Sequence, residues 1–329
     1  MEFRTSVRLP ASLPTLDHTK KILVMGSCFA ENIGNRLSDN KFNTRINPFG
    51  VLYNPSSIAS SVESLLDERI FTSKDLFQQD GVWNSFSHHS RFSDLCLDEC
   101  LNMINVEASA AQKQLKECDM LMITFGSAFV YKLKTNGEIV SNCHKLPEKD
   151  FNRKRLSVDE IVSQYNELIQ RLLTLRPEIN ILFTVSPIRH LKDGLHENQL
   201  SKATLLLAID LVCKSFPKNV FYFPAYEIIM DDLRDYRFYA EDMTHPSTLA
   251  IDYIWECFCN CCLDKKSLQF ITVWQEIQKA VSHRPFQPGS SAFQLFVRKN
   301  KEKLGILSTQ YPSLDFTKEK EYFTGLLSD

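Results

Sequence analysis

Short, continuous runs of apolar residues that end in small or turn-forming residues recur along the chain. Four of these runs predict buried strands, over residues 22–25, 119–126, 180–185 and 220–223. Amphipathic segments between them predict helices over residues 30–38, 55–66, 105–117, 157–175 and 198–215. Strands separated by helices of ten or more residues indicate βαβ units, so the pattern predicts an α/β fold with a mainly parallel sheet.

The remaining strand signals are weaker. Residues 3–9 are expected to form an edge strand, and residues 43–50 a short strand that closes on a Pro/Gly turn. The dipeptide Asn136-Gly137 is typical of a tight turn and predicts a hairpin over residues 132–140.

Residues 81–92 are aromatic, rich in histidine and without a clear period. Irregular insertions in compact domains are often binding loops, so this stretch is interpreted either as a surface hairpin or as a substrate-contacting loop. His88 and His89 are adjacent, and in extended backbone they point in opposite directions. They are therefore not expected to serve one site together.

The pattern from residue 248 almost to the end is helical, with one break marked by Pro285 and Pro288. We therefore predict an α/β domain over residues 1–255 and a helical extension over residues 256–329 that packs on it or beside it.

Composition and charge exclude several classes of protein. The chain has 43% hydrophobic and 24% charged residues, as a soluble globular protein does. Its net charge of −2 and the lack of a basic block with interleaved aromatic residues argue against a nucleic-acid partner. The cationic run Arg153-Lys154-Arg155 is short and is expected to be solvated surface. No segment approaches the roughly 20 apolar residues of a membrane span, and the N-terminus lacks the apolar core of a signal peptide, so a cytoplasmic location is expected.

The ten cysteines are expected to be free thiols, because a chain of 329 residues needs no disulfide framework. Four of them crowd together, at positions 257, 259, 261 and 262. Their CxCxCC spacing matches no common zinc site, and cysteine packs in helical cores as a small hydrophobe. We predict no metal site and no cofactor, since the chain also lacks the glycine-rich loops that bind nucleotides.

The first buried strand ends in Gly26-Ser27-Cys28, and a helical pattern follows directly. A nucleophile at Ser27 or Cys28 would lie at the carboxyl end of a sheet strand, where open α/β sheets bind their ligands. The adjacent helix N-terminus would stabilise negative charge that develops during a reaction.

Asp242 and His245 form a DxxH pair after the last predicted strand. At this spacing the carboxylate can fold back onto the imidazole, fix its tautomer and stabilise the imidazolium formed during proton transfer. The pair is separated from the candidate nucleophile by most of the chain. The two meet only if the sheet brings its first and last loops to one edge.

The residues Gly26 to Ala30 spell GSCFA, and with the DxxH pair they resemble the SGNH (GDSL-like) hydrolase superfamily and, within it, the GSCFA family. The resemblance covers roughly residues 20–255. It includes residues 47–55, where Gly50 matches the glycine of the second conserved block, and residues 119–129, which match the strand leading to the third. It implies a flavodoxin-like three-layer α/β/α sandwich that cleaves or transfers esters, with Asp242 and His245 as acid and base.

Two features depart from the superfamily pattern. The asparagine of the third block, an oxyanion donor in typical members, falls on Ala128, so the donor is expected to come from Asn142 or from the backbone at Gly50. Aligning GSC with GDS without a gap places Cys28 in the serine position and Ser27 in the aspartate position. A shift of one residue would make Ser27 the nucleophile instead, and the sequence leaves both open.

Further polar residues follow the predicted strands and are expected at the same edge. Gly126 ends the second buried strand and Ser127 follows it, and Arg189 and His190 follow the third strand. Arg189 is a candidate to bind a carboxylate or phosphate, unless it pairs with Asp193. Another candidate for substrate contact follows the predicted hairpin, His144.

Together these observations predict a hydrolase (esterase or thioesterase) or an acyltransferase that forms a covalent acyl-enzyme on a small-molecule or carbohydrate ester. The alternative is a catalytically silent module of the same fold that binds a small ligand. Neither oligomeric state nor substrate follows from the sequence.

Overall fold

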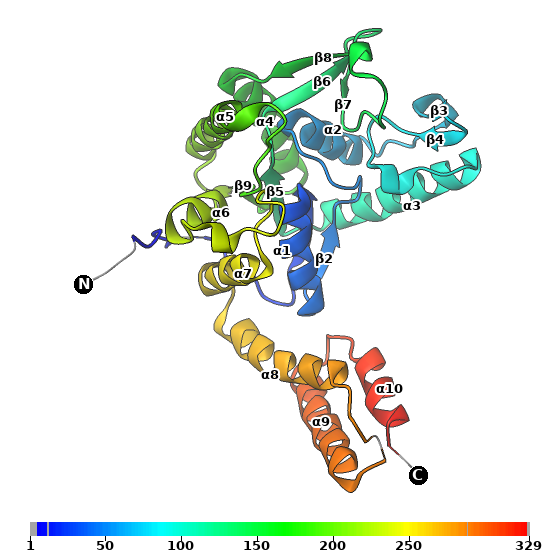
Figure 1. Cartoon of the computed structure of the whole chain (residues 1–329), viewed down its shortest axis with the longest axis vertical. Helices are drawn as coiled ribbons and strands as arrows, with labels where there is room; N and C mark the ends of the chain where they lie inside the picture. Colours follow the sequence, from blue (N-terminus) through cyan, green and yellow to red (C-terminus); the bar gives the residue numbers. More distant parts are fainter. Residues whose placement is uncertain (1–4, 12, 288, 328–329) are drawn as a thin grey trace.

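Five parallel strands form the central sheet of the protein, seen here in a computed structural model that describes residues 5–11, 13–287 and 289–327 (Figure 1). The strands are β1 (Lys21–Gly26), β2 (Asn43–Ile46), β5 (Met120–Phe125), β9 (Asn180–Val185) and β10 (Val220–Tyr222). They lie in the order β10-β9-β5-β1-β2. The chain adds β2 on one side of β1 and then places β5, β9 and β10 on the other side. The strand order therefore reverses at the boundary between β1 and β5, as in flavodoxin-like folds.

Helices cover both faces of the sheet, which gives the expected three layers. One face carries α2 (Pro55–Leu66), α3 (Leu97–Lys116), α4 (Val158–Leu175) and α5 (Gly194–Ser215), and the other carries α1 (Cys28–Asp39), α6 (Ala225–Glu227) and α7 (Thr248–Cys262). Successive residues of a strand point to opposite faces. Leu23 accordingly packs in the core with α2 to α5, whereas Ile22 and Val24 pack in the core with α1 and α7. The predicted fold class is confirmed.

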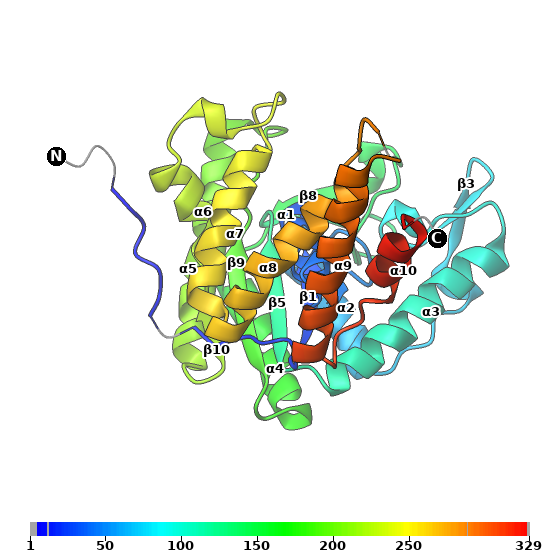
Figure 2. The same ribbon diagram turned by 90° about the horizontal axis from the view of Figure 1, so that it is seen from below.

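The C-terminal extension consists of α8 (Lys265–Ser282), α9 (Ser291–Gln310) and α10 (Thr317–Gly325), which lie beyond α7 and α1 (Figure 1, Figure 2). The predicted break falls between α8 and α9, where Pro285 lies, and Pro288 is outside the described residues. The extension holds the end of α1, because the Trp274 indole donates to the carbonyl of Asp39 (2.7 Å) and Lys41 pairs with Glu319. The predicted domain boundary at residue 255 lies within α7.

Several predicted elements need correction. Residues 3 and 4 lie outside the described residues, and residues 5–9 form no strand. Helices α3 and α5 both begin earlier than their apolar patterns indicated, at Leu97 and Gly194. None of the helices in the described part of the chain is both long and apolar enough to span a bilayer.

Two small antiparallel sheets flank the central one. The predicted hairpin is present as β6 (Phe129–Leu133) and β7 (Ile139–Val140), and β8 (Phe151–Arg155) pairs with β6 on its other side. Arg153 and Lys154 are exposed, as the sequence predicts, and β8 also turns the Arg153 guanidinium over the ring of Phe129, 3.9 Å from the ring centroid. Residues 77–79 and 82–84 form the other hairpin, β3 (Phe77–Gln79) with β4 (Val82–Asn84).

His88 follows β4 and is buried among aromatic rings, stacked on Phe49 with 4.8 Å between the ring centroids. Its Nδ1 shares a hydrogen bond of 2.9 Å with the Ser85 hydroxyl. Burial, with a smaller contribution from the nearby Arg69, lowers the pKa of His88 to about 3. The core therefore holds a neutral imidazole.

Acid is expected to destabilise the fold through this residue. In the unfolded chain His88 takes up a proton near pH 6.5, whereas in the folded chain it does so only near pH 3. Between these values the unfolded state binds more protons, so stability falls as pH falls, by about 1.4 kcal/mol per pH unit. Urea unfolding from pH 7 to pH 5 should show about 2 kcal/mol less acid destabilisation in His88→Phe than in the wild type. Equal pH dependence in the two proteins would contradict the prediction.

Candidate active site

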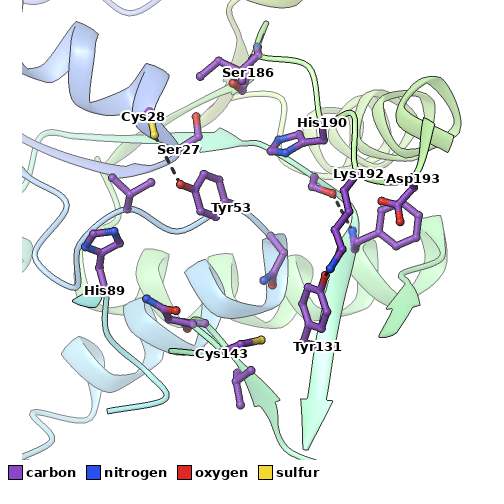
Figure 3. Close-up of a pocket in the computed structure, with 18 of the residues that line it drawn as sticks. Ser27, Cys28, Tyr53, His89, Tyr131, Cys143, Ser186, His190, Lys192 and Asp193 are labelled. Atoms are coloured by element: carbon purple, nitrogen blue, oxygen red, sulfur yellow. Dashed lines mark hydrogen bonds between the residues drawn. The ribbon is translucent and has the colours of Figure 1, made fainter. Parts of the chain in front are cut away.

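A cavity of about 510 Å³ opens at the carboxyl ends of β1, β5 and β9 (Figure 3). It lies where the strand order reverses, the usual ligand site of such sheets, and its volume is within the range of small-molecule pockets. The loops after the three strands line one side, and β6, β7 and β8 contribute the opposite wall through Phe129, Tyr131, Val140 and Arg153. His89 reaches the cavity while its neighbour His88 is buried, as alternation predicts.

The turn from β1 into α1 presents Ser27 and Cys28 to the cavity. Gly26 begins this turn at φ +137°, and a Cβ there would lie 2.3 Å from the carbonyl oxygen of Thr124 on β5, so only glycine fits. Ser27 is buried and is the N-cap of α1, its hydroxyl accepting a hydrogen bond from the N–H of Phe29 (3.3 Å). Cys28 is the first residue of the helix and is only half-buried.

Tyr53 is the side-chain partner of the thiol, with its hydroxyl 3.7 Å from Cys28 Sγ (Figure 3). Burial, and next the neighbouring thiol, raises the pKa of Tyr53, so the phenol keeps its proton and can donate it to the sulfur. The carbonyl of Tyr53 accepts hydrogen bonds from the N–H groups of Gly126 and Ser127, which joins this loop to the end of β5. Sequence analysis missed Tyr53, because it lies in an irregular loop with no pattern of its own.

Asp242 and His245 form the hydrogen-bonded pair that their spacing predicts. Asp242 Oδ2 lies 2.5 Å from His245 Nδ1, and Oδ1 accepts the backbone N–H groups of His245 and Thr244, each at 2.9 Å. These backbone donors, that of His245 first, hold the pKa of the Asp242 carboxyl well below its usual range. The N–H of Arg189 donates to the carbonyl of Thr244 (3.1 Å), which ties the loop after β9 to the histidine loop.

His245 lines the same cavity as Ser27 and Cys28, so the first and last loops of the sheet do meet. Within the described residues, His245 forms no hydrogen bond with either side chain, and its imidazole is half exposed. In enzymes without bound substrate, catalytic hydrogen bonds are often long and tighten only when the substrate binds.

The other predicted site residues divide into two groups. Those that line the cavity are Ser127, Asn142, Arg189 and His190. Those absent from its lining are Gly50, Gly126 and His144.

Each residue of the second group has another structural role. The N–H of Gly50 donates to the carbonyl of Asn47 (2.7 Å), and a Cβ on Gly50 would lie 2.1 Å from that of His89. This loop therefore needs glycine for close packing. His144 Nε2 pairs with the carbonyl of Ser85 (2.8 Å), and the carbonyl of Gly126 accepts a hydrogen bond from Lys202.

Lys202 on α5 is buried behind the cavity, and its ammonium group joins two of the loops. It donates to the carbonyls of Gly126 (2.7 Å) and Ser186 (2.6 Å), which follow β5 and β9. Burial lowers the pKa of Lys202 to about 7. Nearby, burial and next the charge of Lys202 lower the pKa of His190 to about 4, and its buried Nε2 has no hydrogen-bond partner within the described residues.

Ala128 is buried and offers no side-chain donor, and its N–H donates to the Ser201 hydroxyl (2.8 Å). The N–H of Cys28 lies at the start of α1, where backbone donors have no partner within the helix. It forms no hydrogen bond within the part of the chain that the structure describes. This N–H is therefore available to a ligand.

Comparison with known proteins gives one family. A model of the GSCFA family matches residues 21–258, and a model of the C-terminal domain of GSCFA domain proteins matches residues 274–329. A search of curated proteins found no match. Among solved structures, an acetyl xylan esterase from the rumen bacterium Butyrivibrio proteoclasticus is similar over 75% of this chain, with 8% identity and a TM-score of 0.37. The chain covers 65% of the length of that esterase.

Proposed function

Because the chain belongs to the GSCFA family, we propose that it is an acyl-transfer enzyme that cleaves an ester or thioester through a covalent intermediate on Cys28. One observation carries the proposal. The half-buried thiol at the start of α1 and the imidazole of the Asp242–His245 pair face one cavity of ligand size.

In the first step Cys28 Sγ attacks the carbonyl carbon of the ester, and His245 takes the thiol proton. The negative charge of Asp242 stabilises the imidazolium of His245. The hydrogen bond from His245 Nδ1 to Asp242 keeps His245 Nε2 on the side of the ring away from the carboxylate. The tetrahedral intermediate then collapses, the bond to the alcohol oxygen breaks, and that oxygen receives the proton from His245. The product of this step is a thioester on Cys28.

In the second step a water molecule attacks the thioester carbon while His245 removes its proton. The carbon–sulfur bond breaks, and the proton returns to the thiolate, which restores the free enzyme. An alcohol in place of water would give an acyltransferase by the same route.

The local structure favours Cys28 over Ser27 as the nucleophile. Ser27 is buried and its hydroxyl caps α1, a position that serine and aspartate fill equally well. This supports the register in which Ser27 takes the aspartate position of the GDS motif and Cys28 the serine position. The unpaired N–H of Cys28 supplies one oxyanion donor, whereas the N–H of Gly50 is already used within its own turn.

A catalytically silent binding module is the second candidate. Two observations favour it: Ala128 offers no side-chain donor to the oxyanion, and His245 does not reach the candidate nucleophile by a hydrogen bond. Loss of one oxyanion donor typically costs about 2.7–4 kcal/mol of transition-state stabilisation.

Covalent labelling with peptide mapping tests the proposal. We expect iodoacetamide to alkylate Cys28 faster than the exposed Cys96, and His245→Ala to remove this difference. Failure of Cys28 to react faster than Cys96 would favour the binding module.

Ser27→Ala separates the two candidate nucleophiles. We expect it to lower the free energy of unfolding by about 1 kcal/mol through loss of the helix cap, and to leave alkylation of Cys28 and ester hydrolysis in place. Cys28→Ala is the matched variant and should abolish both. A Ser27 adduct with a fluorophosphonate, or loss of hydrolysis in Ser27→Ala alone, would assign the reaction to the serine.

A further inference from the structure

Arg189 lines the cavity, and within the described residues no carboxylate pairs with its guanidinium. Arg153 and Lys192 also line the cavity, but Arg153 pairs with Asp193 and Lys192 pairs with Glu148. The alternative that Arg189 pairs with Asp193 therefore does not hold. We propose that Arg189 recognises a carboxylate carried by the ester substrate, an inference that rests on the proposed function and names its substrate class.

Arg189 is held in place by aromatic residues and not by an ion pair. Its guanidinium lies over the ring of Tyr239, 4.0 Å from the centroid, and 5.1 Å from that of Tyr236. The hydroxyls of Tyr239 and Tyr236 also hydrogen-bond the guanidinium, and because they are neutral they orient it without balancing its charge. A guanidinium has five N–H donors, so others remain for an anion. The acidic residue beside these tyrosines, Asp235, pairs with Arg237 instead.

The position of Arg189 suits a group on the substrate. Its backbone N–H donates to the carbonyl of Thr244, the residue before His245. Both residues line the cavity that holds Cys28, and Arg189 also lines the neighbouring hollow that Tyr236 and Tyr239 form. An ester bound with its carbonyl carbon at Cys28 can therefore reach Arg189 with a substituent while His245 serves the reacting atoms.

The ionisable residues that line the cavity suit a ligand that carries one negative charge. Burial lowers the pKa of both His89 and His190, so these histidines are neutral at pH 7. Lys202 lies behind the lining, where its ammonium group is used by two backbone carbonyls. Among the arginine and lysine residues that line the cavity, Arg153 and Lys192 are paired, so Arg189 is the one whose positive charge is left without a carboxylate within the described residues. A carboxylate balances that charge, whereas a phosphate monoester dianion would bring a second negative charge with no free partner.

A pair of acetyl esters that differ only in charge tests the inference. 4-Acetoxybenzoate carries a carboxylate, and 4-acetoxybenzamide carries a neutral amide in its place. With each rate divided by that of uncatalysed hydrolysis, we expect kcat/KM to be about tenfold higher for the carboxylate ester. Arg189→Gln should remove this preference by raising KM for 4-acetoxybenzoate, with less than about twofold change for the amide, and Arg189→Lys should restore part of it.

Arg171→Gln is the matched control, because it removes an exposed arginine that pairs with Asp67 and does not line the cavity. It should behave as the wild type. No preference for the carboxylate ester in the wild type, or a preference that survives in Arg189→Gln, would overturn the inference.

A binding measurement separates this inference from the proposed function. The probes are 4-hydroxybenzoate, 4-hydroxybenzamide and inorganic phosphate, each tested for protection of Cys28 against iodoacetamide. Protection by 4-hydroxybenzoate alone, lost in Arg189→Gln, supports the carboxylate site even in a protein that hydrolyses neither ester. Equal protection by the benzamide, or stronger protection by phosphate, counts against it.

Discussion

Replacing Asp242 with asparagine is expected to lower kcat for ester hydrolysis by about 10³–10⁴-fold while the fold is retained. The amide oxygen of asparagine can still accept the backbone N–H groups of Thr244 and His245, which Asp242 Oδ1 accepts now. The amide NH₂, however, would face His245 Nδ1 and force that nitrogen to accept a hydrogen bond. The proton then resides on Nε2, which can no longer take one from Cys28. Steady-state kinetics and the thermal unfolding midpoint measure the two effects.

Asp235→Asn serves as the control, because Asp235 is also exposed and also accepts a backbone N–H, that of Arg237. It should leave kcat unchanged. If Asp242→Asn retained more than about a tenth of the wild-type kcat, the pair would have only a structural role and the proposed mechanism would be wrong.

Replacing Lys202 with methionine is expected to lower kcat/KM by about 100-fold, although Lys202 does not line the cavity. The ammonium group holds the loops after β5 and β9 together through the carbonyls of Gly126 and Ser186. Methionine keeps most of the volume but leaves both carbonyls without this donor. The loops that carry Ser127 and Arg189 should then shift, which hydrogen exchange of residues 126–128 and 186–190 would detect as faster exchange.

Lys214→Met is the matched control, because Lys214 lies on the same helix but is exposed and paired with Asp210. Unchanged exchange and activity in Lys202→Met would show that the lysine does not position the loops.

The pH dependence of unfolding gives an independent readout for Lys202. Its pKa is about 7 in the folded protein, against an ordinary value of 10.5. Between these values the unfolded chain binds more protons, so this residue makes stability rise with pH, by about 1.4 kcal/mol per pH unit. The rise should be smaller in Lys202→Met.

Local sequence patterns carried a signal for some of the features that sequence analysis missed, and none for others. Lys202 lies three and seven residues before Leu205 and Ile209, on the buried stripe of α5. That spacing was a usable signal, but lysine is so seldom buried that sequence analysis did not consider this residue for the core. For β8 no such signal existed, because its residues are mostly polar without an apolar alternation, and the strand is defined by its pairing with β6.

The sequence by itself determined the α/β class, the main strands and helices, and the placement of Ser27 and Cys28 at the end of β1. It also determined the Asp242–His245 pair. These features depend on periodicity and on contacts between residues close in the chain, which a sequence displays directly. Only the tertiary structure decided that Tyr53 contacts Cys28, that Arg153 and not Arg189 pairs with Asp193, and that Gly50 and His144 lie outside the cavity. Such contacts depend on the paths of loops and on packing between distant segments, which leave no local pattern.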